Sequence, residues 1–161
     1  MNTPAPSKQA TLLFLIKDQK ILLAMKKRGF GKGRWNGVGG KPDKGETIEQ
    51  AAVRECQEEI EVTPLTYEQV STLNFFFPGD KSDWNQQVIV YFCDTWQGEP
   101  TETEEMKPKW YDLTSIPYDS MWQDDKYWLP EAIAGKFVEA EFHFDDSDGV
   151  LKQQVNTKQL V

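Results

Sequence analysis

A layered α+β domain, with a large mixed or antiparallel β-sheet and few helices, is the fold class that the sequence predicts. Segments rich in β-branched, aliphatic and aromatic residues outnumber segments with helix signals. The chain of 161 residues, 39% of them hydrophobic, has the length of one domain and the apolar side chains for a sizeable core. No repeat, low-complexity tract or interior linker divides it. We therefore expect a flexible N-terminus over 1–9 and a single domain over 10–161.

The strands are predicted from apolar or alternating runs that polar turns separate. The turn KDQ (17–19) joins the first two of these runs, and DDSDG (145–149) has the composition of a hairpin turn between the last two. The predicted strands cover residues 11–16, 20–27, 71–77, 86–96, 107–113, 136–144 and 150–160.

Two helices are predicted. Thr47 and Gln50 have the spacing of a capping box, which places a helix over 48–60. A second, short helix is expected to include residues 130–134, with Pro130 in its first turn and Gly135 at its end.

Charge and composition exclude several classes of function. A formal net charge of −8 argues against a nucleic-acid polymer as partner, because binding a phosphate backbone needs a basic face. The apolar run 11–16 is too short to cross a membrane, so the expected location is cytoplasmic. Cys56 and Cys93 fit neither a disulfide framework nor a zinc site and are expected to be buried. A small polyphosphate remains a suitable ligand if divalent cations bridge it to carboxylates.

The helix predicted over 48–60 carries acidic residues on an unexpected side. At about 100° per residue, Glu55 and Glu59 continue the apolar line of the first two turns, and Glu58 lies about 60° from Glu55. The side expected to face solvent is formed by Gln50, Arg54, Gln57 and Glu61. Clustered carboxylates repel one another, and a hard ion with oxygen ligands, Mg²⁺ or Mn²⁺, would relieve that repulsion. The alternative is a charged helix paired with Lys and Arg side chains.

The loop before this helix contains glycines at 37, 39, 40 and 45, which permit close backbone approach to an ion. Together, Gly40, Glu46 and the run RECQEEIEV (54–62) closely resemble the Nudix box, the signature of hydrolases that act on nucleoside diphosphates linked to another group. One position departs from the family pattern: Glu61 stands where the family usually has glycine, so we expect the helix to end differently there.

Three further segments, 21–41, 97–110 and 121–128, look like the oxidised purine nucleoside triphosphatase (8-oxo-dGTPase) branch of this family. The resemblance implies a Nudix-type α/β/α sandwich with a mixed β-sheet. It also implies hydrolysis of 8-oxo-dGTP and 2-hydroxy-dATP to monophosphate and pyrophosphate, which would sanitise the nucleotide pool. The implied cofactor is Mg²⁺, with Mn²⁺ able to substitute, and the implied partner is a small nucleoside triphosphate bound by a monomer.

Carried over residue by residue, the resemblance assigns a site. The implied metal ligands are the Gly39 carbonyl, Glu55, Glu58, Glu59 and Glu105. The implied substrate-binding residues are Lys26 near the phosphates and, around the base, Thr11, Phe30, Asn36, Phe75, Phe77, Trp122, Asp124 and Asp125. Within this set we expect Glu58 to act as general base and Arg54 to orient a neighbouring carboxylate. The plainer alternatives are core aromatics, a surface lysine, and a helix N-cap for Asp124 and Asp125.

Two other functions remain open at this point. The same box could serve a different nucleotide, such as a nucleotide sugar, a dinucleoside polyphosphate or ADP-ribose. The fold could also serve as a non-catalytic nucleotide sensor, which the complete set of glutamates disfavours.

Overall fold

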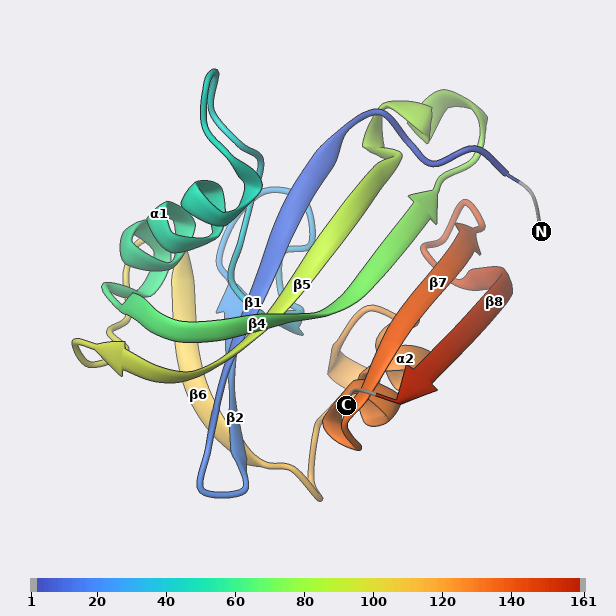
Figure 1. The fold of residues 1–161 in the computed structure, drawn as a ribbon. Coiled ribbons are helices and arrows are strands. Elements are labelled where there is room, and N and C mark those ends of the chain that lie inside the picture. The colour runs from blue at the N-terminus through green and yellow to red at the C-terminus, as the bar shows by residue number, and fades with distance from the viewer. Residues whose placement is uncertain (1–2, 160–161) are drawn as a thin grey trace.

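A mixed β-sheet with one helix on each face organises the chain, as the ribbon in Figure 1 shows. The structure is a computed structural model that describes residues 3–159. Its strands are β1 (Gln9–Lys17), β2 (Lys20–Lys26), β3 (Trp35–Asn36), β4 (Thr63–Phe76), β5 (Gln86–Gln97), β6 (Met106–Asp112), β7 (Lys136–Phe144) and β8 (Val150–Gln159). The helices are α1 (Ile48–Ile60) and α2 (Asp125–Ile133), with short 3₁₀ segments η1 (Gly79–Trp84) and η2 (Tyr118–Ser120).

The sheet has the strand order β3-β2-β1-β5-β4-β7-β8, and β6 pairs with β2 away from this path. The pairs β1/β5 and β4/β7 are parallel, and the other strand pairs are antiparallel. Side chains of one strand alternate between two cores: Phe14 of β1 packs in the core that contains α2, whereas Leu13 and Leu15 pack in the core beneath α1. The predicted mixed sheet between helices is therefore confirmed.

Helix α1 begins as the sequence predicts. The Thr47 hydroxyl accepts from the Gln50 N–H at 3.1 Å, and the Gln50 side chain accepts from the Thr47 N–H at 2.9 Å, which completes the capping box. The end of the helix differs from our expectation. Glu61 itself takes the left-handed conformation (φ 60°, ψ 36°), so the helix ends as it would with glycine and the glutamate carries the strain.

This strain leads to a stability prediction. Glu61→Gly is expected to raise the free energy of unfolding by about 1 kcal/mol, because glycine adopts a left-handed conformation without a Cβ clash. Chemical denaturation measures the change. Glu49→Gly, the same substitution at an exposed position inside α1, is the matched control and should destabilise by a similar amount. A lower stability of Glu61→Gly would mean that the Glu61 side chain makes a useful contact that outweighs the strain.

The second helix is longer and earlier than predicted. Helix α2 begins at Asp125, so Pro130 lies inside the helix and not in its first turn; Gly135, with φ 91°, follows its end as expected. The buried side chains of α2 are Asp125, Trp128, Leu129 and Ala132, a helical stripe of positions i, i+3, i+4 and i+7. Because the first member of this stripe is an acid, the apolar periodicity that would have revealed the helix is incomplete.

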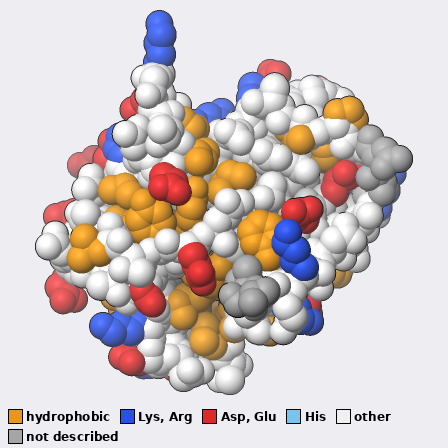
Figure 2. Space-filling view, viewed as in Figure 1, with side chains coloured by type: hydrophobic (Ala, Val, Ile, Leu, Met, Phe, Trp, Pro, Cys, Tyr) orange, Lys and Arg blue, Asp and Glu red, His pale blue; other side chains and the backbone are white. Residues whose placement is uncertain are grey.

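The strand predictions hold with changes of extent. Strand β4 begins at Thr63, well before the predicted 71–77, and β3 and the two 3₁₀ segments were not predicted. The predicted last strand extends to residue 160, which lies outside the described residues. Both cysteines are buried, as expected. None of the described helices is long and apolar enough to span a membrane. On the face drawn in Figure 2, basic side chains are scattered among acidic ones and form no continuous stripe.

Candidate active site

The largest group of predicted site residues meets in one pocket beside β1 and the loop that joins β3 to α1. All nine predicted substrate-binding residues line it: Thr11, Lys26, Phe30, Asn36, Phe75, Phe77, Trp122, Asp124 and Asp125. Gly39 and Glu59 of the predicted metal set line the same pocket. The pocket therefore extends from an aromatic end, near α2, to an acidic end, near α1.

The loop between β3 and α1 is pinned to β1, and this contact builds the acidic end. The N–H of Thr11 donates to the Gly40 carbonyl at 2.8 Å, and the Thr11 hydroxyl lies 3.2 Å from the Gly40 N–H. A Cβ at Gly39 would lie 1.9 Å from the Thr11 carbonyl, and one at Gly40 would lie 2.6 Å from the carboxyl carbon of Glu55. Both positions therefore require glycine, because neighbouring atoms leave no room for a Cβ.

Glu59 is the buried acid of this end. Its Oε2 accepts from the Gly39 N–H at 2.9 Å, and only 4% of the residue is exposed. Burial raises the pKa of Glu59 to about 8, although the hydrogen bond from Gly39 and the charge of Lys26 act in the opposite direction. Burial also raises the pKa of Glu55, whose neighbours include the carboxylates of Glu58 and Glu105.

Arg54 holds the outer part of the acidic cluster together. Its Nε and Nη2 donate to the two oxygens of Glu46, at 2.9 and 3.0 Å. Its Nη1 donates to Glu55 at 2.8 Å and to Glu58 at 3.1 Å, while Nη2 also reaches the Lys41 carbonyl at 3.0 Å. These bonds raise the pKa of Arg54 and lower that of Glu46. The position of Arg54 is consistent with the orienting role expected for it. Its side chain is less exposed than the sequence predicted when it placed Arg54 on the solvent-facing side of the helix.

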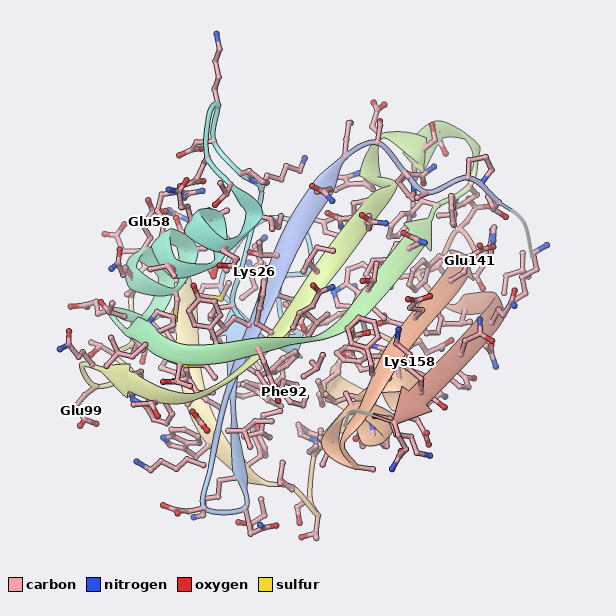
Figure 3. All side chains as sticks on the ribbon, viewed as in Figure 1. Lys26, Glu58, Phe92, Glu99, Glu141 and Lys158 are labelled. Atoms are coloured by element: carbon pink, nitrogen blue, oxygen red, sulfur yellow. The ribbon has the colours of Figure 1, made fainter. Side chains whose placement is uncertain are left out.

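Glu58 and Glu105 lie at the solvent edge, with side chains that are 58% and 52% exposed. Figure 3 shows Glu58 projecting from α1, with Lys26 between α1 and β1 in this view. Glu105 pairs with Arg28 at 3.7 Å, and Thr103 ties its loop to α1 by donating to the Glu59 carbonyl at 2.8 Å.

Within residues 3–159, no three His, Cys, Asp or Glu side chains stand close enough together to hold a metal ion without rearrangement. The donors nevertheless fit a hard divalent cation. Carboxylate and carbonyl oxygens are the ligands of Mg²⁺. The pKa of Glu59 is raised mainly by burial and also by the charges of Glu55 and Glu105, so a cation among these acids would favour their ionised forms. The candidate ligands that face the pocket are Glu59 and Gly39, with Glu55 directly behind Gly40.

The aromatic end is built from rings that stack on one another. Phe30 stacks on Trp122 with ring centroids 5.0 Å apart, and Trp84 of η1 stacks on the same Phe30 at 3.9 Å. Phe77 meets Phe144 face to face at 4.8 Å. Trp84, Phe144 and Arg34 were not predicted as site residues. They belong to a 3₁₀ segment, a distant hairpin and a basic loop. Because these segments are far apart in the sequence, no local pattern indicates that the three side chains lie near one another.

Asp124 and Asp125 form the buried acidic floor of this end, each 2% exposed. The indole N–H of Trp128 donates to Asp124 Oδ2 at 2.9 Å and to Asp125 Oδ1 at 3.1 Å. Asp124 stands at the N-cap position of α2, as the plainer alternative expects, but its side chain makes no capping hydrogen bond to the helix. The remaining oxygen of Asp125 is buried without a protein partner.

Burial governs the ionisation of this pair. It raises the pKa of Asp124 to about 6, and burial together with the charge of Asp124 raises that of Asp125 further above the ordinary range. The pair therefore keeps a proton to higher pH than two ordinary aspartates would. Asn36 lines the same pocket, and its side-chain oxygen accepts from the Gly37 N–H at 2.9 Å.

Comparisons with known proteins agree with this geometry. A family model described as the NUDIX domain matches residues 6–132. A Mus musculus protein named oxidized purine nucleoside triphosphate hydrolase is 43% identical over 145 residues, which cover 90% of this chain and 92% of that protein. Its Danio rerio namesake is 40% identical over 150 residues, covering 93% and 95%. The crystal structure of a MutT protein from Bacillus halodurans has the same fold, with a TM-score of 0.79 at 22% identity over 92% of this chain and 97% of that one.

Proposed function

The chain belongs to the Nudix hydrolase family, and from this premise we propose that it hydrolyses oxidised purine nucleoside triphosphates to monophosphate and pyrophosphate. One observation carries the proposal: a single pocket joins an aromatic end with two buried, coupled acids to the face of the glutamate helix. A nucleotide needs both ends of the pocket. The flat faces of its base pack on aromatic rings, whereas its negatively charged phosphates need cations. The names of the mouse and zebrafish relatives support the same substrate class.

At the aromatic end, the purine lies against the aromatic side chains that line the pocket, Trp122 among them, with its polar edge toward Asp124 and Asp125. The second oxygen of Asp125 is buried without a protein partner. A base N–H that donates to it, or a base carbonyl that accepts from it when it is protonated, recovers the cost of its burial. The Asn36 amide also lines the pocket and can bond to the base.

At the acidic end, Lys26 faces the phosphates and the glutamates of α1 face the phosphoanhydride to be broken. When bound there, Mg²⁺ would neutralise phosphate oxygens and make coordinated water more acidic. The ligands proposed for it are the Gly39 carbonyl, Glu55, Glu58, Glu59 and Glu105. Mn²⁺ is expected to substitute.

Among these acids we assign the general base to Glu58. Its carboxylate is open to water, and Arg54 fixes one of its oxygens at 3.1 Å, so the other oxygen can take a proton from an attacking water. Glu55 and Glu59 are more enclosed and are proposed as ligands. Action as a monomer stays a prediction. The cytoplasmic location stays a prediction.

A pyrophosphate-release assay tests the proposal. Purified protein with Mg²⁺ is expected to release pyrophosphate from 8-oxo-dGTP and 2-hydroxy-dATP with higher kcat/KM than from dGTP and dATP. The panel includes a nucleotide sugar, a dinucleoside polyphosphate and ADP-ribose. Faster turnover of one of these would assign the site to another nucleotide, and tight binding without turnover of any compound would support a nucleotide sensor.

A further inference from the structure

The indole ring of Trp122 is held by groups from several segments of the chain. Phe30 stacks on it, and Phe77 and Phe144 approach it edge-on, with centroids 6.2 and 5.9 Å away. A cation is also in contact: the Cζ of Arg34 lies 4.2 Å from the ring centroid. Neighbouring rings alone permit sliding of one ring over another, whereas a guanidinium anchored elsewhere defines one position for the indole.

Arg34 has such an anchor. Its Nη1 and Nη2 donate to the same oxygen of Asp148, at 3.3 and 3.4 Å. The two side chains are 33% and 25% exposed, so solvent screens this pair less than it would a fully exposed one. The guanidinium thus contacts the indole ring of Trp122 while its N–H groups bond to Asp148.

The anchor is itself rigid. Asp148 lies in the turn between β7 and β8, where Asp145 Oδ1 accepts from the N–H groups of Ser147 and Gly149 at 2.8 and 2.9 Å. The Gln123 side chain, next to Trp122, accepts from the Val150 N–H at 2.7 Å and fixes the start of β8 beside the pocket wall. A hairpin far along the chain is in this way connected to the pocket.

We propose that Arg34 is a positioning residue for the base-binding wall, and that Asp148 keeps it in place. The contact fixes the Trp122 ring in the orientation that receives the purine, before substrate arrives. This inference rests on the proposed function, because it takes Trp122 as a wall of the nucleotide site. Asp148 does not line the pocket, and its side chain bonds to Arg34, so we expect its effect on binding to pass through Arg34.

Arg34 also lines the pocket, and a direct contact with substrate phosphates is the competing role. The number of phosphates on the ligand separates the two roles. For Arg34→Met, which keeps an aliphatic chain of similar length, we expect the KM for 8-oxo-dGTP and the Kd for 8-oxo-dGMP to rise together by about 10-fold, with kcat changed less than about twofold. A loss clearly larger for the triphosphate would overturn the positioning role.

Two further variants sharpen this test. Asp148→Asn keeps a residue that tolerates the left-handed conformation (φ 64°) and removes only the charge. Asp148→Asn should reproduce most of the loss of affinity seen in Arg34→Met. The double variant should bind no more weakly than Arg34→Met alone, because both changes act on the same contact with Trp122. Additive losses of affinity would contradict the proposal that Asp148 acts through Arg34. Arg34→Lys should recover part of the affinity, because lysine keeps the charge without the planar fork. Lys32→Met, on the same loop and exposed, is the matched control and should bind as the wild type does.

A readout without substrate keeps the inference separate from the proposed function. In ¹H–¹⁵N spectra of the ligand-free protein, the indole signal of Trp122, assigned with Trp122→Phe, should shift or broaden in Arg34→Met and in Asp148→Asn. Unchanged signals in both variants would mean that Arg34 does not fix the ring. If the wild type turned over no oxidised purine nucleotide, the proposed function would fail, and these spectra would still decide whether Arg34 positions Trp122.

Discussion

Replacing Glu59 by glutamine is expected to lower kcat at least about 100-fold, the scale of losing a charge that stabilises the transition state. The substitution is nearly isosteric. Glutamine keeps an oxygen that can accept from the Gly39 N–H, so the contact between the glycine loop and α1 survives. It removes the negative charge that an all-oxygen Mg²⁺ site requires. Steady-state kinetics at saturating Mg²⁺ measure the change.

A stability measurement and a control variant show whether the loss of kcat comes from the missing charge or from a damaged fold. Because the Glu59 carboxyl is buried and its pKa is raised to about 8, the neutral amide should not destabilise the fold at neutral pH. Glu68→Gln, an exposed position on β4, is the control and should keep wild-type kcat. If Glu59→Gln retained most of its kcat with Mg²⁺ present, the assignment of a metal site to this cluster would be wrong.

Periodic local signals account for the parts of the fold that the sequence predicted. The capping box at Thr47 and Gln50 fixed the start of α1, and apolar runs fixed most strands to within a few residues. The acidic side of α1 was also predictable, because Glu59 falls in line with Ala52 on the helix and both are buried. Such features depend only on residues a few positions apart.

Tertiary contacts decided the features that were missed. The extent of α2 depends on burial of Trp128 and on its bonds to Asp124 and Asp125, which no local propensity encodes. Glu61 adopts a left-handed conformation because the chain must turn from α1 into β4, and that need outweighs side-chain strain. The contact between Arg34 and Trp122 joins residues from separate loops, so spacing along the sequence gives no indication of it.

The proposed contact of Asp124 and Asp125 with the base leads to the last expected result. Asp124→Asn should weaken kcat/KM for 8-oxo-dGTP by about 1 to 3 kcal/mol, the usual cost of mispairing a buried hydrogen bond. Burial and the mutual repulsion of Asp124 and Asp125 favour a proton on the pair, and a pair that holds one proton can both donate to and accept from a base edge. The amide cannot exchange these roles by moving a proton. The preference between 8-oxo-dGTP and 2-hydroxy-dATP should therefore change, while Mg²⁺ affinity stays the same.

Stability separates this role from a structural one. A buried acid whose pKa rises on folding, here from about 4 to about 6 for Asp124, makes the folded state less stable as pH increases through that window. Asp124→Asn removes this loss and can still accept from the Trp128 indole. Its melting temperature relative to wild type should therefore rise as the pH increases from about 4 to about 6 and change no further above that. Asp119→Asn, an exposed acid on η2, is the control and should change neither selectivity nor stability. Equal losses of kcat/KM on both substrates, together with a lower melting temperature, would instead mean that Asp124 only anchors Trp128. A purely structural anchor would not distinguish the edges of the two bases.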